Sequence, residues 1–213
     1  MAFPADSHIA VFTKPPTPGL VKTRLVPALG AHGAAALHEY LLVRTLHMVA
    51  SADASASLWV AGNPADAALR ACTDDFALPA HRQTGADLGG RMALALRASL
   101  GAHRRVLLIG SDCPALTAAH LREAAARLDC DTPAVFIPAE DGGYVLVGVH
   151  APACTHLDVL LRAAFDDIPW STEDVMRFTR ERLSAKRIRW AELPPLWDVD
   201  RPEDLARLRG TLR

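Results

Sequence analysis

The chain has 213 residues, a formal net charge of −1, and a composition that is 50% hydrophobic and 22% charged. This composition excludes a disordered chain, and the length suits one ordinary hydrophobic core, so we expect residues 1–213 to form a single domain. A nearly neutral chain lacks the basic surface that nucleic acid or an anionic membrane would need, so we expect a small-molecule partner.

Short apolar runs alternate with segments of helical period, which is the pattern of a layered α/β protein. The apolar runs predict strands at 9–12, 57–61, 106–109, 134–138, 144–149 and 188–193. The periodic segments predict helices at 34–50, 65–72, 88–100, 118–128, 172–185 and 202–212.

Two of these runs, 9–12 and 106–109, are apolar at every position, which is typical of parallel strands covered by helices on both faces. Too few residues separate 134–138 from 144–149 for a helical crossover, so at least one neighbouring strand is expected to be antiparallel or displaced. The sequence therefore predicts a three-layer α/β/α fold with a mixed, mainly parallel central sheet.

The cysteines show no CxxC spacing and match neither a zinc ribbon nor a disulfide framework; they are Cys72, Cys113, Cys130 and Cys154. The first residues lack the basic and apolar regions of a signal peptide, and no apolar run reaches the ~18 residues that span a bilayer. These observations predict a soluble protein of the reducing cytoplasm.

Lysine is scarce in this chain, occurring only at Lys14, Lys22 and Lys186, and two of the three fall in the segment 14–25 after the first strand. A loop between a strand and a helix is where α/β sheets bind phosphate. Lys14, Lys22 and Arg24 would supply three cations there, and Gly19 would let the backbone approach an anion. Val21 before Lys22 excludes a Walker A motif. The alternative is a solvated, proline-rich turn with incidental charges.

The pattern Lys-x-Pro-x-x-Gly-x-x-Lys-Thr-Arg-Leu at 14–25 resembles the radical-SAM/selenodomain-associated transferase family, type 1. Blocks at 85–92, 110–114, 141–144 and 197–205 are similar to the same family in order and spacing. That family is linked to arsenosugar biosynthesis and belongs to the GT-A, or nucleotide-diphospho-sugar transferase, superfamily. The resemblance extends to molybdenum-cofactor and phospholactate nucleotidyltransferases, and it implies that the loop, Thr23 included, holds nucleotide phosphates.

The segment 87–92 opens a predicted helix, with Asp87 as its N-cap and two glycines near its start. The resemblance implies that this block contacts the nucleotide. Gly89 would let a base or ribose approach, and Arg91 would form a bidentate contact with a phosphate. Helix capping alone would explain Asp87 equally well.

Asp112 follows the most apolar run, at the carboxyl edge of the predicted sheet. Mg²⁺ is usually held there by one or two carboxylates together with substrate phosphates, and the resemblance implies this role for Asp112. We therefore predict a Mg²⁺ or Mn²⁺ site. The alternative is that Asp112 turns the chain before Pro114, with Thr117 capping the next helix.

A second metal ligand is expected late in the chain, because related nucleotidyltransferases place another aspartate there. Asp200 is the residue we select, although the sequence leaves Asp198 open as the ligand. The alternative is a capping box, because Asp200 precedes Glu203 by three residues at the start of a helical segment.

Asp141 lies between two predicted strands in an Asp-Gly-Gly sequence. The resemblance implies that this block, with Gly142 and Gly143, faces the acceptor, where Asp141 would position or deprotonate a hydroxyl. A plain hairpin turn is the alternative. Trp170 is expected on the acceptor side as well, or as a packing residue before a cap made by Ser171 and Asp174.

No motif supports a nucleophilic enzyme: Ser111 lacks a G-x-S-x-G context, and Cys113 has no paired histidine. The reaction we expect is glycosyl transfer from a nucleotide-sugar to a small acceptor. Nucleotidyl transfer with release of pyrophosphate remains open, and so does a non-catalytic nucleotide-binding protein. The sequence contains no pattern from which an oligomeric state can be predicted.

Overall fold

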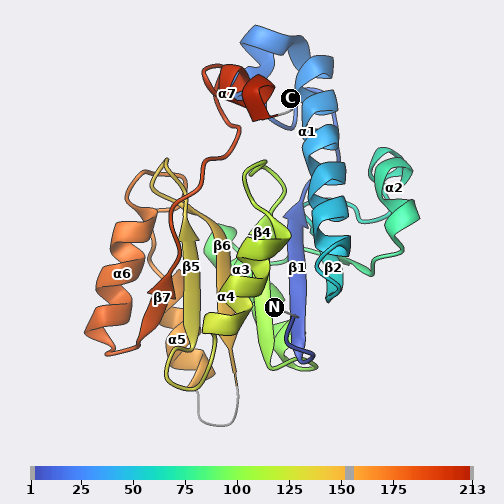
Figure 1. Ribbon diagram of the computed structural model, residues 1–213. Helices are drawn as coiled ribbons and strands as arrows, with labels where there is room; N and C mark the ends of the chain where they lie inside the picture. Colours follow the sequence, from blue (N-terminus) through green and yellow to red (C-terminus); the bar gives the residue numbers. More distant parts are fainter. Residues whose placement is uncertain (1–2, 152–155, 212–213) are drawn as a thin grey trace.

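The computed structural model describes residues 3–151 and 156–211. In this part the chain forms a seven-stranded sheet in the order β3-β2-β1-β4-β6-β5-β7. The strands are β1 Ser7–Thr13, β2 Ser55–Val60, β3 Ala80–Arg82, β4 Arg105–Gly110, β5 Ala134–Pro138, β6 Tyr144–His150 and β7 Trp190–Glu192. β6 runs antiparallel to both β4 and β5, and the other pairings are parallel (Figure 1). The predicted mixed, mainly parallel sheet is confirmed.

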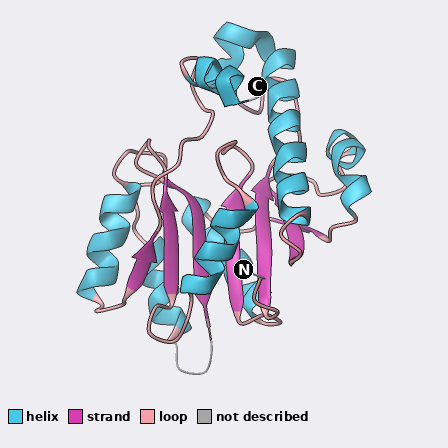
Figure 2. Ribbon diagram, viewed as in Figure 1, coloured by secondary structure: helices cyan, strands magenta, loops and turns pink. Residues whose placement is uncertain are grey.

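The α-helices of the described residues are α1 Val26–Ala50, α2 Ala67–Thr73, α3 Leu88–Leu100, α4 Ala118–Arg127, α5 Leu157–Phe165, α6 Val175–Ala185 and α7 Asp204–Thr211. They cover both faces of the sheet (Figure 2). None of the helices in the described ranges has the length and apolar character needed to cross a bilayer.

Alternation along the central strands sends side chains to two separate cores. On β1, Ile9 and Val11 pack with α1, α2 and α4, whereas Ala10 and Phe12 pack with α3, α5 and α6. Because both faces of β1 are buried, every position of the strand is apolar or shielded, which explains its continuous apolar run.

A third cluster lies beyond the edge of the sheet, where the first half of α1 meets α7 (Figure 1). Its buried members are Leu25, Ala34, Leu41, Trp197, Val199 and Leu208. The segment that leads into α7 is thereby fixed across the top of the sheet, next to the end of β4, where the Val199 N–H donates to the Asp112 carbonyl at 3.0 Å.

Several predicted boundaries were wrong for local reasons. α1 begins at Val26 rather than at 34, because two helical pieces join at Gly30, whose φ of 70° interrupts the periodic pattern. α7 begins at Asp204, whose carboxylate accepts from the backbone N–H groups of Asp200 and Arg201, so the predicted Asp200–Glu203 capping box is not formed. Ser171 does not cap α6, which begins at Val175 after Asp174.

Two elements were missed. β3 is a three-residue edge strand whose residues are all exposed, so it carries no hydrophobic pattern. α5 is amphipathic, but its apolar positions extend over little more than two turns.

The expectation about disulfides was also wrong: Cys72 and Cys113 are free thiols, whereas Cys130 is disulfide-bonded.

Candidate functional site

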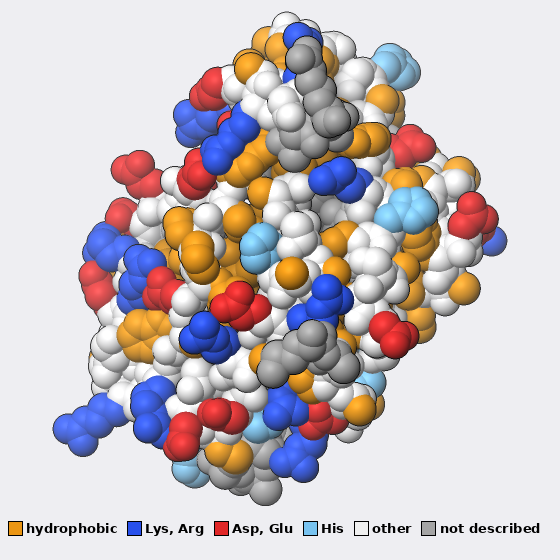
Figure 3. Space-filling view, in the orientation of Figure 1, with side chains coloured by type: hydrophobic (Ala, Val, Ile, Leu, Met, Phe, Trp, Pro, Cys, Tyr) orange, Lys and Arg blue, Asp and Glu red, His pale blue; other side chains and the backbone are white. Residues whose placement is uncertain are grey.

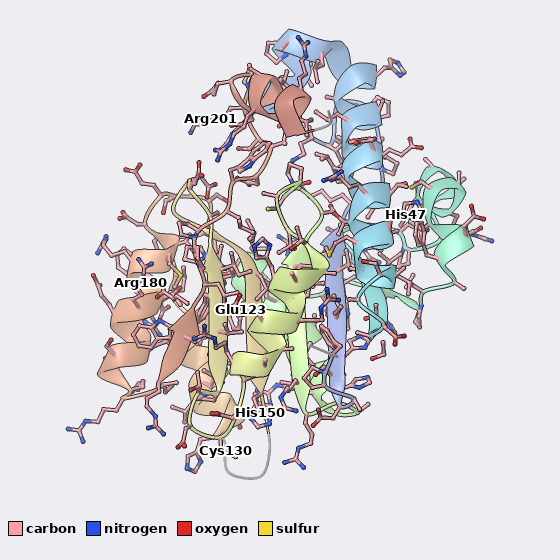
Figure 4. The ribbon with its side chains drawn as sticks, in the orientation of Figure 1. His47, Glu123, Cys130, His150, Arg180 and Arg201 are labelled. Atoms are coloured by element: carbon pink, nitrogen blue, oxygen red, sulfur yellow. The ribbon has the colours of Figure 1, made fainter. Side chains whose placement is uncertain are left out.

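The site is assembled at one edge of the sheet. The carboxyl ends of the parallel strands and the amino end of β6 meet there, beneath α7 and the first half of α1 (Figure 1). Arg201 lies on the connection into α7 at this edge, whereas His150 and Cys130 lie at the opposite edge (Figure 4). Ligands of open α/β sheets bind outside the carboxyl ends of the strands, so this edge is where the predicted residues should gather.

A cleft of about 620 Å³ opens beyond β1, β2 and β3. It is lined by the loop after β1, the end of β2, the end of β3 and the start of α3, with residues including Lys14, Thr17, Gly62, Arg82, Gln83 and Arg91. Among the described residues, Lys14, Arg82 and Arg91 form no ion pair. The cleft therefore presents three uncompensated cations.

The loop that carries Lys14 is held in place by its own hydrogen bonds and by α1. Thr17 N–H donates to the Pro15 carbonyl at 2.8 Å, and Leu20 N–H donates to the Thr17 carbonyl at 3.0 Å. From α1, the buried His38 bonds the Lys14 carbonyl through Nε2 at 3.0 Å. A carbonyl can only accept, so the Nε2 of His38 carries the proton. The loop is ordered, as expected of a binding loop.

Lys22 does not reach the cleft. Its ammonium lies 2.9 Å from the Asp112 carboxylate and also donates to the Val199 carbonyl, and its side chain is only 4% exposed. The backbone of Lys22 has a φ of 47°, in the left-handed region that non-glycine residues seldom adopt. The predicted phosphate-binding lysine and the predicted metal ligand are thus bound to each other.

The electrostatics of Asp112 follow from this pair. Burial by itself would raise the pKa of the Asp112 carboxyl, but the Lys22 ammonium and the His38 ring outweigh it and hold that pKa well below its ordinary range. The Oδ1 atom of Asp112 is buried and accepts no hydrogen bond, with His38 Nδ1 at 3.8 Å. Asp112 is therefore an ionised carboxylate with one unsatisfied oxygen.

Asp198 is the late aspartate that lies beside Asp112. Burial, together with the charges of Asp141 and Asp112, raises the pKa of Asp198 to about 6 against the opposing effect of Lys22. Asp200 instead forms an ion pair with Arg24, which turns both residues toward each other. The structure thus places Asp198, rather than the selected Asp200, next to the predicted metal ligand.

The residues at this point fit a divalent cation that is completed by a ligand. No three His, Cys, Asp or Glu side chains of the described residues are grouped closely enough to hold a metal by themselves. Mg²⁺, however, needs only one or two carboxylates when substrate phosphates and water supply the rest. The unsatisfied Oδ1 of Asp112, next to the half-buried Asp198, meets that requirement.

The block at 141–143 forms the turn between β5 and β6. Asp141 is exposed and its Oδ1 accepts from the Gly143 N–H at 3.0 Å. Gly142 has a φ of 94°, and a Cβ there would lie 1.9 Å from the Glu173 carbonyl oxygen, so only glycine fits. The turn is therefore held against the start of α6, where Met176 N–H donates to the Gly142 carbonyl. This explains the glycine structurally. The Asp141 side chain stays exposed, and its charge raises the pKa of Asp198.

The residues of the block at 87–92 have different roles: one caps a helix, one packs against other side chains, and one lines the cleft. Asp87 caps α3, as predicted, by accepting from the Gly90 N–H at 2.7 Å. Gly89 points away from the cleft, because a Cβ there would meet the Phe165 carbonyl and the Trp170 ring. Trp170 itself packs on Phe165 and Tyr144. Of this block, Arg91 is the residue that lines the cleft.

The remaining predicted residues occupy the loop and the end of β4. Gly19, Thr23 and Arg24 are exposed, with Gly19 at a φ of 80°. The Ser111 hydroxyl donates to that of Thr13 at 3.4 Å, which ties the ends of β4 and β1 together. Burial raises the pKa of the Cys113 thiol to about 12, so Cys113 is no nucleophile at neutral pH.

Sequence reasoning missed Arg82, Gln83 and His38. Arg82 is the last residue of β3 and Gln83 follows it; β3 carries no apolar pattern and was not predicted. His38 lies within α1, where a single histidine on a helical face gives no functional signal. Only the arrangement of distant segments brings these three side chains to the loop after β1.

The fold resembles that of enzymes that transfer groups. A candidate nucleotide-diphospho-sugar transferase from Desulfovibrio desulfuricans G20 is 32% identical over 99% of this chain and 89% of that chain, with a TM-score of 0.84. A cytidylyltransferase from Leptospira borgpetersenii shares the fold at 12% identity, over 97% of this chain and 86% of that one, with a TM-score of 0.64. None of the curated proteins matches the chain.

A third structure with the same fold is CMP:2-keto-3-deoxy-manno-octonic acid synthetase complexed with CTP, at 12% identity over 98% of each chain and a TM-score of 0.59. These likenesses place the chain in the class of transferases with the nucleotide-diphospho-sugar transferase fold. More specifically, the chain belongs to the DUF2064 family, described as an uncharacterized protein conserved in bacteria, whose model matches residues 45–172.

Proposed function

We propose that this protein uses an activated nucleotide as its donor, transferring a sugar from a nucleotide-diphospho-sugar to a small acceptor in the cytoplasm, as a single domain. The observation that carries the proposal is the cleft of about 620 Å³, in which Lys14, Arg82 and Arg91 are free of ion pairs. Cations without partners at the carboxyl edge of a sheet suit a diphosphate, whose charge they neutralise.

The roles divide along the edge of the sheet. The ammonium of Lys14 would attract a phosphate as a compact charge, and the planar guanidinium groups of Arg82 and Arg91 would donate paired hydrogen bonds to phosphate oxygens. Lys22 would release Asp112 and turn to the phosphates when the nucleotide enters. Such a site works by position and charge neutralisation rather than through a covalent intermediate.

Asp112 and Asp198 would hold Mg²⁺ or Mn²⁺, and the ion would neutralise charge on the leaving phosphate. This assignment rests on the unsatisfied Oδ1 of Asp112 and on the accumulation of carboxylates around Asp198. Asp141, exposed at the turn between β5 and β6, would orient or deprotonate the acceptor hydroxyl. Gly142 and Gly143 shape that turn.

Sugar transfer is favoured by the relative from Desulfovibrio desulfuricans G20, which is named as a candidate nucleotide-diphospho-sugar transferase. The resemblance of segment 14–25 to the radical-SAM-associated, arsenosugar-type transferases favours the same reaction. Nucleotidyl transfer is the second candidate, because three free cations in one cleft would also suit a triphosphate and a pyrophosphate leaving group.

Thermal shift over nucleoside triphosphates and nucleotide-sugars, each with and without Mg²⁺, tests the proposal. A ligand present at about a hundredfold over its Kd adds about 2.7 kcal/mol, which raises the Tm by roughly 5–10 °C for a chain of this size. A flat response over the whole panel would overturn nucleotide binding. A positive ligand is then assayed for release of nucleoside diphosphate against release of pyrophosphate, which separates the two reactions.

A substitution of Asp112 tests the proposed metal site separately. Asp112→Asn should abolish turnover while the folded protein keeps its circular dichroism spectrum, because a carboxamide ligates Mg²⁺ poorly. Asp158→Asn, in an exposed ion pair on α5, is the matched control and should retain activity. Full activity of Asp112→Asn would show that Asp112 does not hold the metal.

A further inference from the structure

His38 of α1 lies between the loop after β1 and the end of β4. Its side chain is buried and does not line the cleft. On one side, Nε2 donates to the Lys14 carbonyl at 3.0 Å. On the other side, Nδ1 lies 3.8 Å from Asp112 Oδ1, which is too far for a hydrogen bond. The directed contact of the ring is therefore the one to Lys14.

The peptide that His38 holds has few other means of being fixed. Pro15 carries no N–H, so the Lys14 carbonyl is the only hydrogen-bonding group of the peptide that joins the two residues. The Thr13 hydroxyl also donates to this carbonyl, but at the longer distance of 3.4 Å. The bond from His38 is thus the shorter of the two hydrogen bonds that hold the Lys14 backbone at this point.

The side chain of Lys14 starts from this backbone and lines the cleft. It is exposed and forms no ion pair among the described residues, so no acidic group fixes its ammonium before a ligand arrives. A lysine loses conformational freedom when it binds a phosphate, and a mobile backbone would add to that loss. A backbone that is already held therefore favours binding.

We propose that His38 is a positioning residue for phosphate binding: by holding the Lys14 carbonyl, it pre-orders the Lys14 ammonium without touching the ligand. The inference rests on the proposed function, because it takes the cleft to be the phosphate site. It deepens that function by giving α1 a part in phosphate binding that acts through one backbone carbonyl.

Two amide side chains separate the two sides of the His38 ring. The amide of Gln ends about where Nε2 of histidine lies, so it can donate to the Lys14 carbonyl. The shorter Asn ends about where Nδ1 lies, beside Asp112. His38→Gln should therefore keep the contact with Lys14 alone, and His38→Asn should keep the group beside Asp112 alone. His38→Leu removes both.

Inorganic pyrophosphate without a divalent cation is the probe, because it carries the charge of a diphosphate and neither base nor sugar. In isothermal titration, His38→Leu and His38→Asn should each raise its Kd about fivefold, whereas His38→Gln should stay within about twofold of wild type. His32→Leu, at an exposed histidine of the same helix, is the control and should leave the Kd unchanged. Circular dichroism checks that each variant is folded.

A double-mutant cycle tests whether the effect of His38 passes through Lys14. Lys14→Met should raise the Kd of pyrophosphate about tenfold, because a charge-assisted contact is lost. Adding His38→Leu to Lys14→Met should raise the Kd by less than about twofold more, since no ammonium is left to be positioned. A residue that only stabilises the fold would weaken binding by the same factor in both backgrounds.

Equal effects of His38→Leu in the wild-type and Lys14→Met backgrounds would overturn the inference. Rescue by His38→Asn instead of His38→Gln would overturn it too, because the effect would then pass through Asp112. Both results would leave the proposed function standing, since the wild-type protein would still bind pyrophosphate. A wild-type protein that binds neither pyrophosphate nor any nucleotide would overturn the proposed function, and this inference with it.

Discussion

The two halves of the site differ in how their charges are satisfied. In the cleft beyond β1, β2 and β3, Lys14 and Arg82 are exposed and Arg91 is half-buried, and none of the three has an acidic partner among the described residues. On the other side of the loop, Lys22 is bound to Asp112, and Arg24 is bound to Asp200. Under the proposed function, a ligand can enter the first half as it stands, whereas the second half would have to exchange its internal pairs for contacts with the ligand.

The surface of the rest of the molecule resembles the second half. Over the face shown in Figure 3, basic and acidic side chains are intermixed. Among the described residues, Arg180 pairs with Glu192 and Arg177 pairs with Glu181. A chain with 23 basic and 24 acidic residues can pair most of its charges. Lys14, Arg82 and Arg91 differ from other unpaired cations of the described residues in being gathered in one cleft, which is why we propose that their anion comes from outside.

The largest effect is expected at the Lys22–Asp112 pair. Lys22→Met should lower the free energy of unfolding by about 2 kcal/mol, because it leaves a carboxylate without its cation; the loss is limited by the 43% exposure of the Asp112 side chain. Urea denaturation measures the change, and adding Asp112→Asn should recover part of it. Lys186→Met, at an exposed lysine, is the control; equal losses for both lysines would contradict the assigned pair.

A tenfold effect is expected for the cations of the cleft. Arg82→Ala and Arg91→Ala should each raise the Kd of a bound nucleotide about tenfold, because a charge-assisted hydrogen bond to phosphate is lost. Arg97→Ala, on the same helix as Arg91 but paired with Asp158, should leave the Kd unchanged. If all three variants bind equally well, the cleft is not the phosphate site.

The two halves of the site should also differ in their dependence on salt, and we expect this effect to be smaller than the effects of the substitutions. Raising the ionic strength from about 0.05 to 0.5 M should weaken nucleotide binding several-fold, because exposed cations are screened. The coupling energy between Lys22 and Asp112, measured by the double-mutant cycle, should change little, because the Lys22 side chain is only 4% exposed. Similar salt dependence of both quantities would remove the distinction drawn between the halves.

An effect of pH is expected at His8, which lies outside both halves of the site. Burial, followed by the charges of His103 and His81, lowers the pKa of His8 to about 4 in the folded protein, against about 6.5 when unfolded. Between these values the unfolded chain binds more protons, so stability is present above pH 6.5 and is lost as the pH falls toward 4. His8→Gln should flatten the dependence of Tm on pH in this range. An unchanged dependence of Tm on pH would show that a group other than His8 causes the sensitivity to acid.

Much of the fold was predictable from local patterns. The runs at 9–12, 106–109 and 134–138 are strands because continuous apolar sequences are stable only between two helical layers. α3 was predicted with its observed bounds, since Asp87 caps it and its apolar positions repeat with the helical period. β3 was not predictable, because a short exposed edge strand is specified by pairing with β2 rather than by its own residues.

The meeting of the candidate residues at one edge of the sheet was predictable, but their pairing was not. A lysine-bearing loop after β1 and an aspartate after β4 must meet at one edge, because both strands are parallel and adjacent. That Lys22 binds Asp112, that Asp198 lies beside them and that Asp200 binds Arg24 depends on how the segment before α7 crosses the end of β4. Burial of Trp197 and Val199 against α1 decides that path.

The sequence by itself determined the layers, the mixed sheet and the edge where ligands are expected, because these follow from periodicity and from strand direction. Only the tertiary structure decided which charges are left free. Lys14 is exposed in a cleft while Lys22, in the same loop, is buried against a carboxylate. The difference arises from contacts between segments far apart in the chain, and the energy of an ion pair depends on distance and burial that no local pattern specifies.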